Sequence, residues 1–152
     1  MSVVVDARNG QRGDYAAWVA AFEDLWRGGR ANLNRFMDIM GPDIRLIAPG
    51  LKPTQGKPAC TEAFRRTFAL LPDLTAQVHR WSASGDVVFI EMSFTATVAG
   101  RAFTWHNVDR FLFRDGYAVE RVAYFNPAKL RRAFLGRPAG WLQLLRRARS
   151  GL

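Results

Sequence analysis

The stretch Arg101–Asn126, with the sequence RAFTWHNVDRFLFRDGYAVERVAYFN, decides the fold because it has the pattern of a β-hairpin. Apolar side chains alternate with polar ones on both sides of Asp115-Gly116, a dipeptide typical of hairpin turns. Loops of two and three residues give registers that differ by one residue, and such a slip moves every side chain to the other face. The hydrophobic pattern favours a three-residue loop, Arg114–Gly116, which pairs Phe111 with Val119.

This register gathers a mostly aromatic face that also holds one carboxylate. The members of the face are Phe103, Trp105, Asn107, Asp109, Phe111 and Phe113 on the first strand, against Val119, Arg121, Ala123 and Phe125 on the second. Asp109 is then directly opposite Arg121, with their Cβ atoms about 5 Å apart. A buried charge normally neutralises or finds a partner. Two interpretations follow: a catalytic Asp109–Arg121 pair in a pocket, or an ion pair that fixes the hairpin register.

The opposite face of the hairpin is predicted to carry polar and charged residues. The same register places His106 opposite Tyr124 and Arg110 opposite Glu120. For these side chains we expect packing at an interface rather than catalysis.

The rest of the chain predicts an α+β fold. Helices are expected over about 15–27, 31–40 and 58–71, with a strand opened by Pro42-Asp43 between the second and third. Strands over about 74–82 and 87–98 lead into the hairpin, and Asn126-Pro127 is a typical helix start. Helices on one face of a strongly curved sheet leave a concave pocket, a usual place for a small apolar ligand. We expect a leader at 1–13, a domain at 14–135 and a basic amphipathic helix at 136–152.

Composition narrows the class of protein. The 152 residues suit one domain, no segment approaches a membrane span, and the N-terminus lacks the pattern of a signal peptide. A single cysteine, Cys60, favours a reducing cytoplasm, and with two distant histidines it forms no metal site. Of the net charge of +9, seven come from residues 127–152, which hold no acid. Because the charge belongs to the tail, we expect no nucleic-acid partner.

These motifs together resemble a SnoaL-like member of the nuclear transport factor 2-like superfamily, over about Tyr15–Phe134. The resemblance rests on the first helix, on Ala48-Pro49-Gly50, on Leu71-Pro72-Asp73-Leu74, and on the runs Val108–Phe111, Arg114–Gly116 and Tyr124–Pro127. It implies a cone-shaped barrel of a mixed or antiparallel sheet with helices packed on its concave side. It also implies a homodimer formed through the outer face (His106, Arg110, Glu120 and Tyr124) and a reaction without cofactor or metal.

The resemblance assigns roles residue by residue. Asp109 occupies the position of the acid–base aspartate of SnoaL-type cyclases and of the protonated oxyanion-hole aspartate of ketosteroid isomerases. The other catalytic positions of relatives fall on residues that cannot perform the chemistry. They are Ala48 and Ala21 for the base and tyrosine of the isomerases, Ala123 for an aspartate of limonene-epoxide hydrolases, and Thr95 for a cyclase histidine. Those mechanisms are therefore not expected here.

Two functions remain from different classes. The leading one is a cyclase-, isomerase- or dehydratase-like acid–base enzyme for an apolar carbonyl compound, and the alternative is a non-catalytic ligand-binding or dimeric assembly domain. The predicted pocket comprises Trp18, Phe22, Trp105, Asn107, Phe111, Ala123 and Phe125 around catalytic Asp109 and Arg121. The last helix has an apolar stripe of Trp141, Leu144, Leu145, Ala148 and Leu152. For this stripe, packing on its own domain or a twin subunit is favoured over weak contact with a membrane surface.

Overall fold

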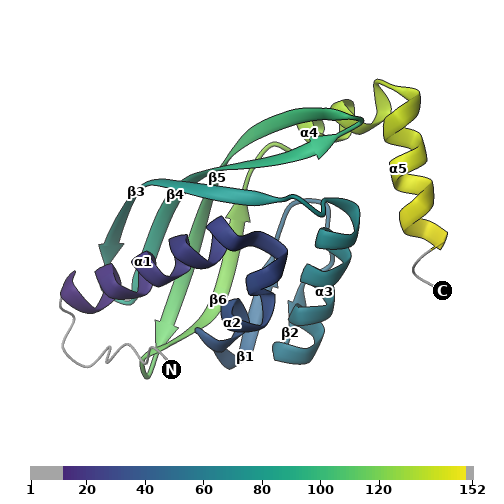
Figure 1. Ribbon diagram of the computed structural model, residues 1–152. Helices are drawn as coiled ribbons and strands as arrows, with labels where there is room; N and C mark the ends of the chain where they lie inside the picture. The colour runs from purple at the N-terminus through teal and green to yellow at the C-terminus, as the bar shows by residue number, and fades with distance from the viewer. Residues whose placement is uncertain (1–11, 150–152) are drawn as a thin grey trace.

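The computed structural model describes residues 12–149, which form helices and one curved sheet (Figure 1). Of the predicted leader, residues 1–11 lie outside this range, and Arg12 already begins the first helix. The elements in chain order are α1 (Arg12–Gly28), the 3-10 helix η2 (Gly29–Asn32), α2 (Leu33–Asp38), β1 (Met40–Ile47), β2 (Thr54–Gln55), α3 (Lys57–Leu70), β3 (Thr75–Ser84), β4 (Val87–Val98), β5 (Arg101–Arg114), β6 (Tyr117–Tyr124), α4 (Pro127–Leu135) and α5 (Pro138–Arg149).

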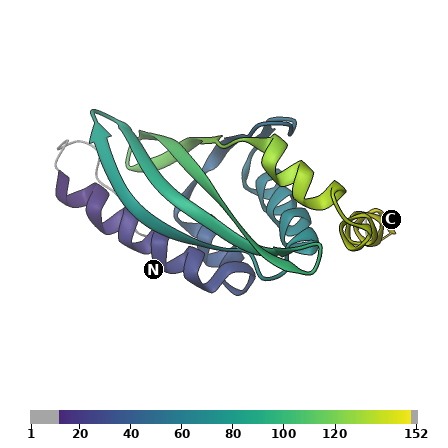
Figure 2. The same ribbon diagram turned by 90° about the horizontal axis from the view of Figure 1, so that it is seen from above.

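The sheet has six strands in the order β2-β1-β6-β5-β4-β3. All neighbouring strands are antiparallel except β1 and β6, which are parallel. The sheet curves strongly around α1 (Figures 1 and 2). Its edge strands β2 and β3 do not pair with each other, so the sheet does not close into a barrel. The predicted α+β class and the mixed, strongly curved sheet with helices on its concave side are confirmed.

Helix α1 supplies the central apolar face because its aromatic residues recur every fourth position. Trp18, Phe22 and Trp26 are all buried, and the Trp18 indole donates a hydrogen bond to the carbonyl of Ile39 at 3.1 Å. The helix ends where predicted, since Gly29 has a φ of +53°. It begins three residues earlier than expected, at Arg12.

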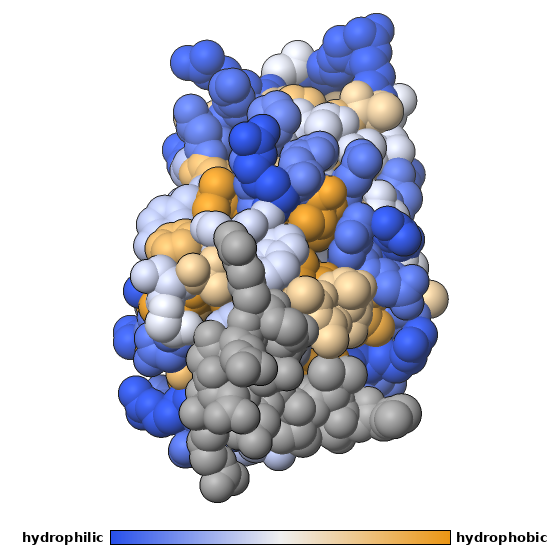
Figure 3. All heavy atoms as spheres, turned by 90° about the vertical axis from the view of Figure 1, so that its left-hand side faces the viewer, coloured by the Kyte–Doolittle hydropathy of each residue, from blue (hydrophilic) through white to orange (hydrophobic). Residues whose placement is uncertain are grey.

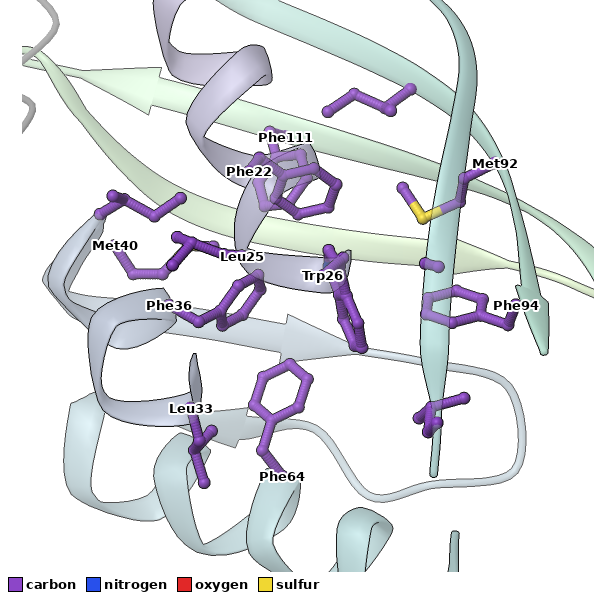
Figure 4. Close-up of a cluster of buried hydrophobic side chains, with 14 of the residues drawn as sticks. Phe22, Leu25, Trp26, Leu33, Phe36, Met40, Phe64, Met92, Phe94 and Phe111 are labelled. Carbon is purple, nitrogen blue, oxygen red and sulfur yellow. The ribbon is translucent and has the colours of Figure 1, made fainter. Parts of the chain in front are cut away.

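Aromatic rings from helices and sheet form a continuous core (Figure 4). The Trp26 ring contacts Phe94 of β4, with ring centroids 4.9 Å apart, and Phe64 of α3 at 6.1 Å. Strand β4 contributes alternate residues, as predicted: Val88, Ile90, Met92, Phe94, Ala96 and Val98 are all buried. The predicted short strand β1 and helix α3 are also present, whereas β2 falls in a stretch predicted as loop.

The register of the β5–β6 hairpin corrects the sequence-based prediction. The turn has two residues, Asp115 and Gly116, both with positive φ (51° and 81°), the geometry of a type I′ turn. A bulge on β6 then inserts Val119, so that Leu112 faces Glu120 while Phe113 faces Ala118.

The turn and the bulge together move the register by two residues from the predicted one. Asp109 therefore pairs with Ala123, and Phe111 pairs with Arg121. On the outer side Tyr124 faces Val108 instead of His106, and Arg110 faces Val122 instead of Glu120. Because side chains alternate with a period of two, this shift preserves both faces. The face assignments were right from Glu120 onward, but beside the turn the fully buried Ala118 faces Phe113, where Val119 was predicted to be on the inner face. The cross-strand pairs were wrong.

The C-terminal helices leave the sheet at one end of the molecule (Figures 1 and 2). As predicted, Asn126 caps α4, since its Oδ1 accepts a hydrogen bond from the Ala128 amide at 3.0 Å. Gly140 lets α5 approach α4 closely, because a Cβ there would lie 1.8 Å from the carbonyl oxygen of Phe134. Gln143 fastens α5 to the body, with its Nε2 donating to the carbonyl of Leu70 at 2.8 Å.

The predicted apolar stripe of α5 does not all pack on the domain. Leu144 is partly buried against the core, but Trp141 and Leu145 are exposed together with Leu142. The packing of this helix on its own body therefore uses Gly140, Gln143 and Leu144. Leu152, also predicted for the stripe, lies outside the described residues.

Candidate functional site

The candidate site is a polar network on the concave face of the sheet. Strand β5 contributes Asn107 and Asp109, which point inward because they are two residues apart, and β6 contributes Arg121. Arg121 reaches Asp109 diagonally across the hairpin, not from the opposite position. All three residues are buried, with 2%, 0% and 9% of their surfaces exposed.

Both oxygens of the Asp109 carboxylate accept hydrogen bonds. The Arg121 Nε donates to Oδ2 at 2.7 Å, and the Asn107 Nδ2 donates to Oδ1 at 2.8 Å. The bond from Arg121 is charge-assisted, since the guanidinium carries a full positive charge. About two of its four acceptor positions stay open.

Two aromatic rings cover the guanidinium of Arg121. Its Cζ lies 5.8 Å from the ring centroid of Trp26 and 5.6 Å from that of Phe64, within cation–π range. The sequence-based prediction did not include these two residues in the site. Continuing the four-residue spacing from Trp18 and Phe22 would have found Trp26. Phe64 gave no such signal, because its position depends on how α3 packs.

The network leaves two buried polar atoms without a protein partner. They are the Asn107 Oδ1 and the Trp26 Nε1. The orientation of the Asn107 amide follows from its neighbour: its NH₂ group must face the carboxylate, so its oxygen must point elsewhere. One unpaired acceptor and one unpaired donor thus belong to side chains of the network and its aromatic cover.

The other residues predicted for the pocket divide into two groups. Trp18, Phe22 and Phe111 form one aromatic cluster, with Phe111 at 4.8 Å from Trp18 and 5.3 Å from Phe22. Trp105 belongs to a second cluster and stacks on Phe94 at 5.5 Å. Ala123 is buried opposite Asp109, and Phe125 follows β6 and packs at the margin of the core. The two groups flank the network and extend its apolar surroundings.

The interior around the network is closely packed. A cavity of about 10 Å³ is lined by Trp26, Phe36 and Phe64 together with Leu25, Gly29, Leu33 and Phe68. This volume is about what one water molecule needs. A second hollow of about 230 Å³ lies at β3 and β4 and is lined by Arg27, Thr75, Ala76, Gln77, Ser93 and Thr95. None of the residues predicted for the pocket lines either space, and a substrate pocket around Asp109 stays a prediction.

The residues predicted for a dimer face lie on the outer side of the sheet. The Arg110 Nη2 lies 2.6 Å from the Glu120 Oε1, and Tyr124 is half exposed. His106 lies beside His79 of β3, with ring centroids 6.4 Å apart, and the His79 Nε2 is 2.9 Å from the Ser93 Oγ. Pairing of two chains through this face stays a prediction.

Cys60 near the start of α3 is a packing residue. Its thiol is fully buried and donates to the carbonyl of Ile44 at 3.4 Å. Burial raises the pKa of the Cys60 thiol above its usual value, and this opposes formation of a reactive thiolate.

A strongly curved sheet with α1 on its concave side defines an α+β protein of the nuclear transport factor 2-like fold. The family model described as SnoaL-like domain matches residues 15–121, and the chain belongs to this family. No curated protein matches the chain in sequence. Among the described residues no helix is long and apolar enough to cross a membrane.

Solved structures with low sequence identity share the fold. A putative SnoaL-like polyketide cyclase from Jannaschia sp. CCS1 superposes with a TM-score of 0.71 at 18% identity, over 81% of this chain and 92% of that one. TerC, co-crystallised with polyporic acid, gives 0.70 at 18% identity, over 78% and 95%. An epoxide hydrolase from M. tuberculosis, described as LEH-like, gives 0.64 at 18% identity, over 85% and 92%.

Proposed function

We propose that this chain is a small-molecule enzyme that performs acid–base chemistry on an apolar carbonyl compound without a cofactor. The observation that carries the proposal is the Asn107–Asp109–Arg121 network in an otherwise aromatic interior. A charged group in such surroundings is costly, so its presence needs a structural or a chemical reason. The two unpaired polar atoms beside it favour a chemical one.

The network supplies the groups that proton abstraction next to a carbonyl requires. Asp109, oriented by its two donors, accepts the proton from the carbon atom. The electron pair left on that carbon moves to the carbonyl oxygen, and the resulting enolate oxygen accepts hydrogen bonds from the Arg121 Nη groups. Return of the proton from Asp109 to another carbon of a conjugated enolate gives isomerisation. Attack of the enolate carbon on a second carbonyl carbon of the same molecule gives cyclisation, and the alkoxide oxygen formed there takes the proton back from Asp109. One positioned group contributes about 10²–10⁴-fold to such a step.

The unpaired atoms define the polar part of a substrate. The Asn107 Oδ1 would accept from a hydroxyl group, and the Trp26 Nε1 would donate to a carbonyl oxygen. In structural networks buried polar atoms are nearly always satisfied. A compound with both groups on an apolar skeleton would satisfy both atoms and fill the aromatic surroundings.

Entry of such a compound requires movement of side chains. Asp109 is fully buried, whereas the Arg121 side chain keeps 11% of its surface exposed, so the network is closest to solvent at Arg121. Trp26 and Phe64 cover the guanidinium there. We propose that these rings swing aside to admit the substrate.

The burial of Asp109 and Arg121 favours a second candidate function. If Asp109 and Arg121 only fix the hairpin, the chain is a non-catalytic ligand-binding or assembly domain of the same fold. The alanines at 21, 48 and 123, where relatives of this fold carry catalytic side chains, support that alternative.

The test uses 1-tetralone, which has hydrogens on the carbon next to its carbonyl, and polyporic acid, the compound in the TerC crystals, as a binding probe. Binding is measured by calorimetry, and proton abstraction is measured by mass spectrometry of the deuterium that 1-tetralone takes up from D₂O. We expect catalysed deuterium uptake, and a loss of about 10²–10⁴-fold in Asp109→Asn with binding changed only a few-fold. Asp115→Asn, which changes an exposed turn carboxylate, is the matched control and should retain full activity.

Binding without turnover by the unaltered chain would support the ligand-binding alternative. Turnover that survives in a folded Asp109→Asn variant would remove Asp109 from the mechanism.

A further inference from the structure

The C-terminal helices carry a surface that differs from the rest of the molecule. Leu135 at the end of α4 and Trp141, Leu142 and Leu145 of α5 are exposed, the last three by 57%, 56% and 59%. We call these four residues the apolar patch. They lie together because Trp141, Leu142 and Leu145 share one side of α5, and the Trp141 indole donates to the carbonyl of Leu135 at 2.8 Å.

Basic side chains border this patch. Arg131 and Arg132 precede Leu135 by four and three residues, so they lie on the same side of α4. Arg137 is in the short link between the two helices, and all three arginines are exposed. No acidic residue occurs anywhere in residues 127–152.

We propose that α4 and α5 dock on the anionic surface of a lipid bilayer. The apolar patch would enter the boundary between headgroups and acyl chains, and Arg131, Arg132 and Arg137 would contact lipid phosphates. Amphipathic helices with tryptophan and leucine on one side and arginines around them bind membrane surfaces in this way. Tryptophan suits the position because its ring is apolar while its N–H stays hydrogen-bonded.

The charge of the region argues against a second copy of this chain as the occupant. An isologous contact would place the patch of one copy against that of the other. Arginines of both copies would then meet without any acid from residues 127–149 between them, and like charges repel. Anionic lipid supplies the opposite charge together with an apolar layer. A nucleic acid would supply the charge but would leave the four apolar side chains without a partner.

The arrangement of the fold leaves the surface accessible. Helix α5 forms one end of the molecule in both ribbon views, beyond α3 and away from α1 (Figures 1 and 2). Gly140 and Gln143 hold it to α4 and to the body, so its outward side is fixed. Figure 3 faces the opposite end of the molecule, where hydrophobic and hydrophilic residues are interspersed among the coloured atoms.

The test is co-sedimentation of the full chain with vesicles of phosphatidylcholine alone or with about one third phosphatidylglycerol. We expect binding only to the anionic vesicles, weakened by salt because exposed charges are screened. Leu142→Ser/Leu145→Ser should reduce the partition coefficient about tenfold or more. Arg131→Gln/Arg132→Gln/Arg137→Gln should reduce it on the order of a hundredfold, at about fivefold for each charge.

Matched controls lie outside the two helices. Leu51→Ser changes a leucine that is 62% exposed, and Lys52→Gln removes an exposed charge beside it. Both should bind vesicles like the unaltered chain, and circular dichroism should show that all variants fold. Equal binding to neutral and anionic vesicles, or none to either, would overturn the proposal. So would a dimer in sedimentation equilibrium that Leu142→Ser/Leu145→Ser dissociates, because a second copy would then occupy the patch.

Discussion

The interior around Asp109 and the apolar patch on α4 and α5 depart from the usual distribution of polar and apolar residues in opposite directions. The first encloses a carboxylate and a guanidinium among aromatic rings, and the second exposes a tryptophan and three leucines to solvent. In the interior each charge has a partner at 2.7 Å, whereas on the surface the apolar groups have no cover within the described residues. A self-contained fold needs neither feature.

The comparison shows how differently the two features bear on stability. Removal of one partner from a buried pair leaves an uncompensated charge, so the fold depends on the pair once it exists. Exposed leucines contribute little to folding, and their replacement leaves the body intact. The interior feature is tied to the fold, whereas the surface feature is free to serve a partner.

The largest effect is therefore expected from the ion pair. Asp109→Ala should lower the free energy of unfolding by about 3–5 kcal/mol, because the Arg121 charge stays buried without its partner. The double replacement Asp109→Val/Arg121→Met should recover most of that loss, since it removes both charges and changes the total volume only slightly. Urea unfolding followed by tryptophan fluorescence measures both.

Leu142→Ser/Leu145→Ser is the reference for the surface and should change the free energy of unfolding by no more than about 0.5 kcal/mol. If the double replacement of Asp109 and Arg121 is as unstable as Asp109→Ala, the ion pair stabilises the fold beyond the neutralisation of each charge by the other. A large loss in the surface variant would mean that the patch is part of the fold.

The sequence predicted the faces of the hairpin better than its pairs. The alternation of side chains places Asp109 and Arg121 on the inner face in every register that differs from the predicted one by an even number of residues. The extra residue Val119 could not be seen, because a bulge changes the parity of one strand without any marker residue. The two-residue turn alone would have turned Glu120 inward, and the bulge restores Arg121 to that side.

The site was predicted to the extent that it depends on neighbouring strands. The contact between Asp109 and Arg121 follows from the hairpin, and so does the hydrogen bond from Asn107 two residues away. The closure of the site depends on α1 and α3 and was not predictable from local pattern. The stripe of α5 was identified, but which side packs is decided by Gln143, a polar residue outside the stripe.

An intermediate effect is expected where the C-terminal helix joins the body. Gln143 accepts from the Ala99 amide at 3.0 Å and donates to the carbonyls of Leu70 and Thr97. Gln143→Ala should cost about 1–2 kcal/mol and release α5 locally. Hydrogen exchange should then become faster in α5 and stay unchanged in β4. Gln77→Ala, at an exposed position of β3, is the control, and unchanged exchange in α5 would show that Leu144 and Gly140 suffice to hold it.

The smallest effect is expected at Asp73. It binds Thr97 of β4, the residue whose carbonyl also accepts a hydrogen bond from Gln143. Its carboxylate accepts hydrogen bonds from the Thr97 hydroxyl at 2.6 Å and from the Thr97 amide at 3.0 Å, and these bonds lower the pKa of Asp73. Because the folded pKa lies below the unfolded value of about 3.9, the stabilisation is fully present above that value. It is lost as the pH falls through the folded pKa.

Asp73→Asn should therefore destabilise the chain by less than about 1 kcal/mol at neutral pH, since the carboxylate is exposed to solvent. The difference from the unaltered chain should shrink as the pH is lowered toward 3. Urea midpoints between pH 3 and 7 measure it, with Asp115→Asn as a carboxylate control. If the difference in stability stays constant over this pH range, the effect comes from the geometry of the hydrogen bonds to Thr97 and not from the charge of the Asp73 carboxylate.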